Sequence, residues 1–246
     1  MNPFSLAGRK ALVTGANTGL GQAIAIGLAA AGAEVICAAR RDCDETLRLI
    51  AAAGGTGSYL RLDFADPMAA RDVFGGAGFD ILVNNAGIIR RADAVEFSEA
   101  DWDDVIDVNL KALFFTCQAF ARDCLARGAA GKIVNIASLL SFQGGIRVPS
   151  YTASKHGVAG LTKLMANEWA AKGINVNAIA PGYIETNNTE ALRADADRNR
   201  AILDRIPAGR WGRPEDIAGT ATFLCSDAAG YLHGVVLNVD GGWMAR

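Results

Sequence analysis

The stretch Lys10-Ala-Leu-Val-Thr-Gly-Ala-Asn-Thr-Gly-Leu-Gly21 decides the fold of this chain. Its first five residues form an apolar run that is too short for a helix and therefore predicts a buried strand. Three glycines follow, and glycine lets the backbone turn where other residues would be strained. From residue 19 to residue 31 the apolar positions recur with a helical period. A strand, a glycine-rich turn and a helix in that order begin an α/β unit.

The same alternation of short apolar runs and helical segments continues along the chain. Helical periodicity is clearest at residues 101–127 and 151–172, and a short helix is expected at 67–74. Alternation of this kind predicts parallel strands joined by right-handed crossovers. The predicted fold class is α/β: a Rossmann-type, doubly wound parallel sheet of about seven strands with helices on both faces, in a single domain over residues 1–246. The expected strands are residues 10–14, 34–38, 58–63, 80–84, 131–137, 174–180 and 235–239.

The composition excludes several classes of protein. The chain has 246 residues, of which 51% are hydrophobic and 20% charged, as in an ordinary globular domain. Its net charge of −2 gives no electrostatic basis for binding nucleic acid or an anionic membrane. No run reaches the roughly 18 apolar residues of a membrane span, and the N-terminus lacks a signal-peptide pattern. We therefore expect a cytoplasmic protein that acts on a small molecule.

The cysteines and histidines predict neither disulfides nor a metal site. Five cysteines are an odd number, are widely spaced and form no Cys-x-x-Cys pair, which is typical of a reducing compartment. The only two histidines, His156 and His233, lie far apart in the sequence. A structural or surface role is the simpler interpretation of both.

The glycine-rich turn also has a chemical use. Backbone N–H groups in such a turn come close to a phosphate, and the N-terminus of the following helix favours its negative charge. The spacing is Gly-x-x-x-Gly-x-Gly, and alone it would also suit a purely structural turn. Its place between the first strand and the first helix predicts a dinucleotide site. The expected contacts are Gly15, Asn17, Thr18, Gly19, Leu20 and Gly21.

The end of the second strand bears on which dinucleotide binds. An acidic residue there would hold the ribose 2′-hydroxyl of NAD, but this chain has Ala39 followed by Arg40 and Arg41. Because a guanidinium suits a 2′-phosphate, we predict NADP, with NAD as the alternative if both arginines are only solvated loop charges. Asp63, at the end of the third strand, is expected either to accept from the adenine amine or to cap the next helix.

Tyr151 and Lys155 are the candidate acid/base pair. Four residues apart in a helical segment, they share one helix face. A free tyrosine has a pKa of about 10, and a nearby ammonium lowers that pKa by favouring the phenolate. Such a tyrosine can exchange a proton with an alcohol or a ketone. Ser138 follows the fifth strand and is placed to orient the same substrate oxygen, although a simple capping role would also suit it.

The chain resembles the short-chain dehydrogenase/reductase family over essentially its whole length. The resemblance rests on the glycine turn, Asn84-Asn-Ala-Gly87, Asn109, Ser138, Tyr151-Thr-Ala-Ser-Lys155 and Pro181-Gly182. It implies that Tyr151 is the general acid/base, that Lys155 lowers its pKa and binds the nicotinamide ribose, and that Ser138 orients the substrate oxygen. It also implies that Asn109 holds a water that links Lys155 to solvent. Further cofactor contacts are expected from Phe64, Asn85, Ala86, Gly87, Pro181, Gly182, Ile184 and Thr186.

A closer resemblance concerns the substrate. Residues 88–99, 140–149, 180–188 and 206–212 are similar to those of bacterial 2-dehydro-3-deoxy-D-gluconate 5-dehydrogenases, also called 2-deoxy-D-gluconate 3-dehydrogenases. This group implies a deoxy-sugar acid as substrate, and its members mostly favour NAD and lack the Arg40-Arg41 pair. A substrate carboxylate needs a cation, and we expect Arg147 or Arg90 to supply it, unless these arginines support a loop or a subunit contact.

A polar segment at residues 183–213 is expected to form a substrate lid. It includes a helical pattern at 189–203. Asn187 and Asn188 come just before this pattern, and we expect them either to cap the helix or to contact hydroxyls of the substrate. The segment between Asp63 and Asn84 is about one helical turn shorter than is usual in the family. That should shorten the helix at 67–74, away from the chemistry.

Two other functions stay open on the sequence. The first is a reductase of another carbonyl, such as a 3-oxoacyl thioester. The second is an NADP-binding sensor without turnover, which the presence of Tyr151 and Lys155 disfavours. The family resemblance further implies a homotetramer, whereas the residues themselves support no particular stoichiometry.

Overall fold

The computed structural model describes residues 2–245, which form one parallel sheet covered by helices on both faces. The strand order is β3-β2-β1-β4-β5-β6-β7, and every neighbouring pair runs parallel. The α/β fold class predicted from the sequence is therefore confirmed. The strands are β1 Lys10–Thr14, β2 Glu34–Ala39, β3 Thr56–Arg61, β4 Ile81–Asn84, β5 Gly131–Ile136, β6 Ile174–Pro181 and β7 Val236–Val239.

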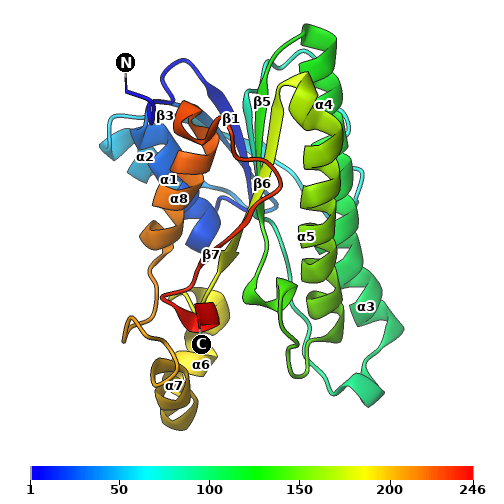
Figure 1. Cartoon of the computed structure of the whole chain (residues 1–246), viewed down its shortest axis with the longest axis vertical. Helices are drawn as coiled ribbons and strands as arrows, with labels where there is room; N and C mark the ends of the chain where they lie inside the picture. The colour runs from blue at the N-terminus through cyan, green and yellow to red at the C-terminus, as the bar shows by residue number, and fades with distance from the viewer. Residues whose placement is uncertain (1, 246) are drawn as a thin grey trace.

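Two helical layers enclose the sheet (Figure 1). On one face, α1 (Gly19–Ala30) packs against α8 (Pro214–Cys225), with α2 (Asp44–Ala52) beside them. The other face carries α3 (Glu99–Ile106), α4 (Ala112–Arg127) and α5 (Pro149–Trp169). Every residue of β1, β4, β5 and β6 except Lys10 and Pro181 is buried, because these central strands have helices on both sides.

The strand order changes direction at β1. From β1 the chain moves to β2 and β3 on one side, and then returns to place β4 on the other side. In open α/β sheets such a switch leaves a crevice outside the carboxyl ends of the adjoining strands, and ligands bind there. The glycine turn after β1 and the Asn84-Asn-Ala-Gly87 motif after β4 both open onto this crevice.

The prediction of a helix at 67–74 is wrong. The segment forms consecutive turns, in which the N–H groups of Ala69, Arg71 and Val73 each donate to the carbonyl three residues earlier. Gly75-Gly76 follow at once, and Gly76 has a positive φ of 73°. A segment this short gains too few hydrogen bonds to offset the cost of helix nucleation when its C-terminal side cannot extend it.

Two other expected helices are interrupted. The segment 101–127 contains a π-helical turn, Asp107–Lys111, between α3 and α4. The segment 189–203 breaks into α6 (Glu190–Ala194) and α7 (Ala196–Leu203), because Asp195 has an extended backbone and its carboxylate accepts from the N–H groups of Asp197 and Arg198. An aspartate that caps a new helix in this way ends the preceding one.

Short one-turn helices complete the chain: Ala94–Glu96, Leu139–Ser141, Ala170–Lys172, Asn187–Thr189, Asp227–Ala229 and Trp243–Ala245. Within residues 2–245, none of the helices is both long and apolar enough to cross a membrane.

Candidate active site

The turn after β1 is fastened to the end of β4. The Thr14 hydroxyl accepts from the N–H groups of Asn85 and Ala86, each at 3.0 Å. In return, the Asn85 amide donates to the carbonyls of Thr14 at 3.0 Å and Gly15 at 3.2 Å. The sequence interpretation did not single out the side chain of Thr14, although a hydroxyl at the end of the first strand was the available signal. These bonds fix the glycine turn and the Asn84-Asn-Ala-Gly87 motif, both predicted to bind the cofactor, in one relative position.

The glycines of this turn leave a cradle that side chains would fill. Gly15 has a φ of 66°, and a Cβ there would lie 2.9 Å from the Asn85 amide nitrogen. A Cβ on Gly21 would overlap the Gly15 carbonyl oxygen and the same Asn85 amide. The turn therefore needs glycine at both positions for close backbone packing.

The N-terminus of α1 opens into the same cradle. Its N-cap residue, Thr18, makes no side-chain cap, and the first turn carries no acidic residue. The leading backbone N–H groups have no intrahelical acceptor, and the helix dipole favours an anion beside them. The cradle therefore fits the pyrophosphate of a dinucleotide.

The ends of β2 and β3 lie side by side at the far end of this cradle. Ala39 is paired with Arg61, so Arg40 follows directly at the sheet edge. Arg40 and Arg41 are exposed, and neither makes an ion pair within residues 2–245. Asp63 accepts from the N–H of Ala65 at 3.0 Å, which is a turn-capping contact. Phe64 is 8% exposed and packs into the core.

Tyr151 and Lys155 share one face of α5, next to the end of β5. The Lys155 ammonium donates to the carbonyl of Ile136 at 2.6 Å and lies 5.5 Å from the centre of the Tyr151 ring. Lys155 is only 5% exposed, while Tyr151 is half-buried. Ser138 follows β5, and its hydroxyl accepts from the N–H of Leu140 at 3.2 Å. The structure thus brings together the three residues of the predicted acid/base group.

Burial shifts the acid/base properties of this group. Burial raises the pKa of the Tyr151 phenol, whereas a hydrogen bond with Ser138 and the positive charge of Arg91 lower it. Burial lowers the pKa of the Lys155 ammonium to about 8. Perturbed groups that meet in a crevice at the ends of parallel strands are typical of a catalytic site.

Asn109 lies in the π-helical turn between α3 and α4, and this turn positions its side chain. Its amide oxygen accepts from the N–H of Ile88 at 2.8 Å, and its amide nitrogen donates to the Ile88 carbonyl at 2.8 Å. The same nitrogen lies 3.4 Å from the hydroxyl of Ser154, which is one residue from Lys155. Gly87 passes so close that a Cβ there would lie 3.2 Å from the Asn109 oxygen. Asn109 therefore joins the loop after β4 to α5.

The segment after β6 passes beside the glycine turn. Gly182 packs against Asp240, where a Cβ would lie 2.6 Å from the Asp240 Cα. Ile184 is 4% exposed, and the Thr186 side chain lies 3.7 Å from the position that a Cβ on Gly19 would take. Pro181, Gly182, Ile184 and Thr186 thus follow one another along the edge that holds the glycine turn. The next residues, Asn187 and Asn188, are exposed.

The structure gives both expected carboxylate-binding arginines other partners. Arg90 contacts Asp101 at 3.2 Å and Asp104 at 3.0 Å. The guanidinium of Arg147 lies 3.0 Å from the carboxylate of Asp93. As substrate contacts, Arg90 and Arg147 stay predictions, and the ion pairs hold their side chains on loop and helix surfaces.

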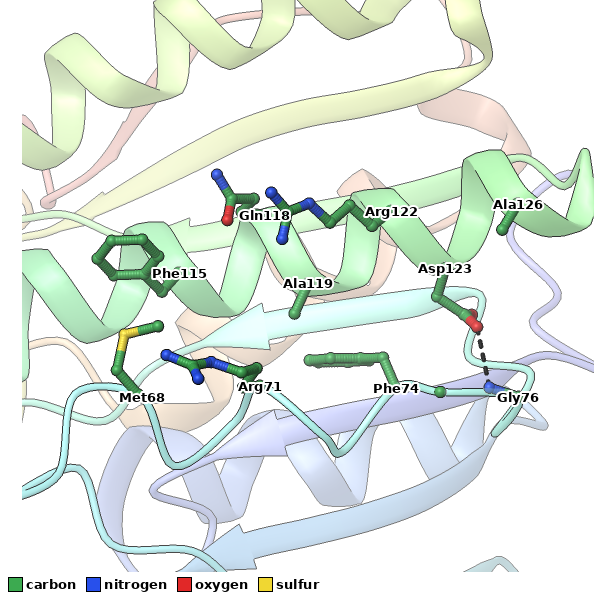
Figure 2. A pocket seen from close by; sticks show the side chains of 11 residues that line it. Met68, Arg71, Phe74, Gly76, Phe115, Gln118, Ala119, Arg122, Asp123 and Ala126 are labelled. Carbon is green, nitrogen blue, oxygen red and sulfur yellow. Dashed lines mark hydrogen bonds between the residues drawn. The ribbon is translucent and has the colours of Figure 1, made fainter.

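A hollow of the molecule lies away from this site (Figure 2). It has a volume of about 730 Å³ and lies between α4 and the turns at 68–76, where the expected helix is missing. Phe74 and Ala119 form its floor, and the N–H of Gly76 donates to Asp123 across one end at 3.2 Å. None of the predicted catalytic or cofactor residues lines it. The hollow thus lies outside the predicted site.

Comparisons with known proteins show which family the chain resembles. The sequence pattern of the family described as "Enoyl-(Acyl carrier protein) reductase" matches residues 15–244. The 2-dehydro-3-deoxy-D-gluconate 5-dehydrogenase of Dickeya dadantii is 55% identical over 251 residues, with 100% of this chain and 99% of the relative covered.

Two solved structures are similar over the whole of both chains. The first, from Agrobacterium tumefaciens, was provisionally named 2-deoxy-D-gluconate 3-dehydrogenase; it holds bound NADP, is 80% identical and has a TM-score of 0.99. The second, from Beutenbergia cavernae, was provisionally named NAD(P)-dependent gluconate 5-dehydrogenase; it holds NADP at low occupancy, is 53% identical and has a TM-score of 0.96. With its cradle, its Ser138-Tyr151-Lys155 group and these relatives, the chain belongs to the short-chain dehydrogenase/reductase family.

Proposed function

We propose that this chain is an NAD(P)-dependent oxidoreductase that interconverts a hydroxyl and a keto group on a deoxy-sugar acid, 2-dehydro-3-deoxy-D-gluconate or 2-deoxy-D-gluconate. One observation carries the proposal: Ser138, Tyr151 and Lys155 meet at the end of β5, in the same crevice as the glycine cradle after β1. Hydride transfer needs a dinucleotide held beside an acid/base group, and this crevice provides both. The names of the Dickeya and Agrobacterium relatives support the sugar-acid substrate.

The nicotinamide supplies or accepts the hydride, and the protein handles the proton. Tyr151 removes the hydroxyl proton when the alcohol is oxidised, and returns it to the carbonyl oxygen in the reverse direction. The Lys155 ammonium favours the phenolate form of Tyr151 by its charge and donates to the ribose hydroxyls. Ser138 orients the substrate oxygen, and Asn109 holds a water that links Lys155 to solvent.

NADP is the proposed cofactor, with NAD as the alternative. The Agrobacterium relative binds NADP at 80% identity, and the exposed Arg40 and Arg41 have no ion-pair partner within residues 2–245 to compete with a 2′-phosphate. The expected contacts in the glycine turn are Asn17, Thr18, Gly19 and Leu20. The lid, defined as residues 183–213, closes over the substrate, and Asn187 and Asn188 meet its hydroxyls.

We further propose a cytoplasmic homotetramer. The five cysteines are all free and buried, which suits a reducing compartment. Leu125 on α4 and Leu164 on α5, two helices that cover the same face of the sheet, are each more than 40% exposed. Burial of these side chains between copies would stabilise an assembly. Light scattering of the purified protein should then give four times the chain mass of 25.7 kDa.

Initial rates test the function. The purified enzyme is assayed with 2-dehydro-3-deoxy-D-gluconate and 2-deoxy-D-gluconate, each with NAD and with NADP. We expect turnover of a sugar acid that falls at least about 100-fold in Tyr151→Phe, because general acid/base catalysis contributes that much or more. Failure of both sugar acids would reject the substrate, and a panel that includes a 3-oxoacyl thioester would then test the other carbonyl. If no carbonyl is turned over, the oxidoreductase proposal itself fails.

A further inference from the structure

The lid begins with a turn whose shape is fixed by its own hydrogen bonds. The Thr189 hydroxyl donates to the carbonyl of Ile184 at 2.7 Å and accepts from the N–H of Thr186 at 3.1 Å. The N–H of Thr189 in turn donates to the carbonyl of Thr186 at 3.1 Å. The methyl group of Thr186 lies 3.7 Å from the position that a Cβ on Gly19 would take. The start of the lid therefore lies against the N-terminus of α1, where the cradle opens.

Arg193 on α6 is attached to this turn. Within the part of the chain that the structure describes, its side chain makes one hydrogen bond, from Nη2 to the carbonyl of Thr186 at 3.2 Å. That carbonyl also accepts from the N–H of Thr189, and the bond from Arg193 is the longer of the two. A guanidinium has five N–H donors. Arg193 therefore has four donors left over beside the residue that contacts Gly19.

One of these donors is buried without an acceptor. The Nε atom of Arg193 is shielded from solvent and has no hydrogen-bond partner among residues 2–245. Arg193 also makes no ion pair within these residues. The nearby acid Asp195 uses its carboxylate to cap α7. A buried donor on a charged group costs free energy until it meets an acceptor, and an anion is the acceptor that suits a guanidinium.

The cradle has no cation of its own. Residues 14–21 include neither lysine nor arginine. Arg40 and Arg41 follow β2 at the far end of the cradle, where the 2′-phosphate is expected. Backbone N–H groups and the dipole of α1 are the other groups that face the two negative charges of a pyrophosphate here. Arg193 thus supplies, from the lid, the kind of charge that the cradle lacks.

We propose that Arg193 binds the pyrophosphate of the dinucleotide and so fastens the lid over the cofactor. The inference rests on the dinucleotide part of the proposed function and is independent of the sugar acid. A guanidinium pairs with phosphate oxygens through two parallel hydrogen bonds, which fixes orientation as well as position. Because Arg193 belongs to the lid, closure of the lid and binding of the dinucleotide stabilise each other.

The first test compares ligands with and without a pyrophosphate. Calorimetric titration measures the dissociation constants of NADP, NAD and adenosine 2′-monophosphate, which keeps the 2′-phosphate and lacks the pyrophosphate. Arg193→Gln should weaken NADP and NAD alike, each by about 10- to 100-fold, because a hydrogen bond between charged groups contributes that much. Adenosine 2′-monophosphate should change by less than about 3-fold. Arg193→Lys keeps the charge without the planar fork and should lie between.

Amide hydrogen exchange provides a second readout, on the lid itself. NADP should slow exchange at residues 187–203 in the wild type, and Arg193→Gln should lose this protection even when it is saturated with NADP. Without NADP, the variant and the wild type should exchange at equal rates in this segment. Faster exchange in the NADP-free variant would show that Arg193 only supports the lid, and it would overturn the proposal.

A control variant separates this role from the general charge of the lid. Arg200→Gln removes an exposed arginine from α7 and should leave all three affinities unchanged. NADP affinity within about 3-fold of the wild type in Arg193→Gln would overturn the proposal. So would an equal loss for adenosine 2′-monophosphate, because that ligand has no pyrophosphate. A wild type that binds neither dinucleotide would reject the oxidoreductase function itself, and the role of Arg193 with it.

Discussion

The ammonium of Lys155 is a buried charge on which both the proposed catalysis and the stability of the fold depend. It is enclosed between α5 and the end of β5, with one carbonyl oxygen as its nearest acceptor. Burial without a counter-ion disfavours the charged form. At the same time, the charge is what favours the phenolate of Tyr151. The residue therefore destabilises the fold in the protonated state that the proposed chemistry uses, as is common for catalytic groups.

This conflict predicts a pH-dependent stability. The pKa of Lys155 falls from an ordinary 10.5 to about 8 in the folded chain. Between these values the unfolded chain binds more protons, so the free energy of unfolding rises with pH across that window. Relative to Lys155→Met, the wild type should gain about 2 kcal/mol between pH 7 and pH 9.5. Urea unfolding of both proteins at several pH values measures this, since the other titrating groups cancel. Parallel curves would contradict it.

Arg40 and Arg41 carry the second prediction at this scale. Replacing both with alanine should lower kcat/KM for NADP by about 10- to 100-fold and leave NAD within about 3-fold, because only NADP has the 2′-phosphate that we propose they contact. Arg48→Ala is the matched control, since Arg48 is an exposed arginine on α2 that is paired with Glu45. An equal effect of the double variant on both cofactors would show that the two arginines are ordinary solvated charges.

Among the elements, the glycine turn between β1 and α1 has the least freedom to vary. Gly15 and Gly21 meet across the turn, and Asn85 from the end of β4 lies between them. The turn can therefore keep its shape only if the backbones of Gly15 and Gly21 and the side-chain amide of Asn85 approach closely. The π-helical turn at Asp107–Lys111 is a second such element, because it re-aims Asn109 into the crevice.

Gly21→Ala should disrupt the cradle. The added Cβ would overlap the Gly15 carbonyl and the Asn85 amide, both of which are held by neighbouring strands. We expect a loss of about 1–3 kcal/mol in the free energy of unfolding from overpacking, and a KM for the dinucleotide raised at least about 10-fold. Gly160→Ala on α5 is the control: a Cβ there meets nothing within 4 Å, and helix propensity should make it neutral or stabilising. Unchanged dinucleotide affinity in Gly21→Ala would refute this account of the turn.

At the scale of the whole molecule, a small hydrophobic core holds the proposed lid, residues 183–213. It is separate from the two hydrophobic cores that flank the sheet. The side chains that pack together are Leu139 next to Ser138, Trp243 near the C-terminus, and Ile202, Ile206 and Trp211 of residues 183–213. Arg205 stacks on the Trp243 ring at 3.9 Å, and Tyr183 lies 4.7 Å from it between ring centres. The C-terminal turn therefore connects the lid to the active-site loop.

Removing the centre of this core should loosen the lid. Trp243→Ala should cost about 3 kcal/mol or more by urea unfolding, and amide hydrogen exchange should accelerate across residues 187–206. Trp243→Phe should lower the free energy of unfolding much less, because it keeps an aromatic ring in this core. It also removes an indole N–H that is buried without a partner within residues 2–245. Trp102→Ala, at a 40% exposed position on α3, serves as the surface control. Unchanged exchange in the lid would disprove the coupling.

The sequence by itself determined the strands and their α/β order, and it predicted the residues of the proposed acid/base group. These follow from local signals: short apolar runs, a glycine turn at a strand end, and the four-residue spacing of Tyr151 and Lys155. The observed strand ends differ from the predicted ones by no more than two residues. The difference is largest at the exposed edge strand β3, whose residues are less buried and so show a weaker apolar pattern. Local rules suffice there because each signal lies within one element.

Only the tertiary structure decided which acidic residues pair with Arg90 and Arg147, where Asn109 points and that residues 67–74 form turns. Arg90 and Arg91 are adjacent and alike in sequence, and they differ because α3 brings Asp101 and Asp104 to one of them alone. Arg147 is taken by Asp93, more than fifty residues away along the chain. Such pairings depend on how distant loops meet, and the free energy that selects them comes from contacts that no local pattern encodes.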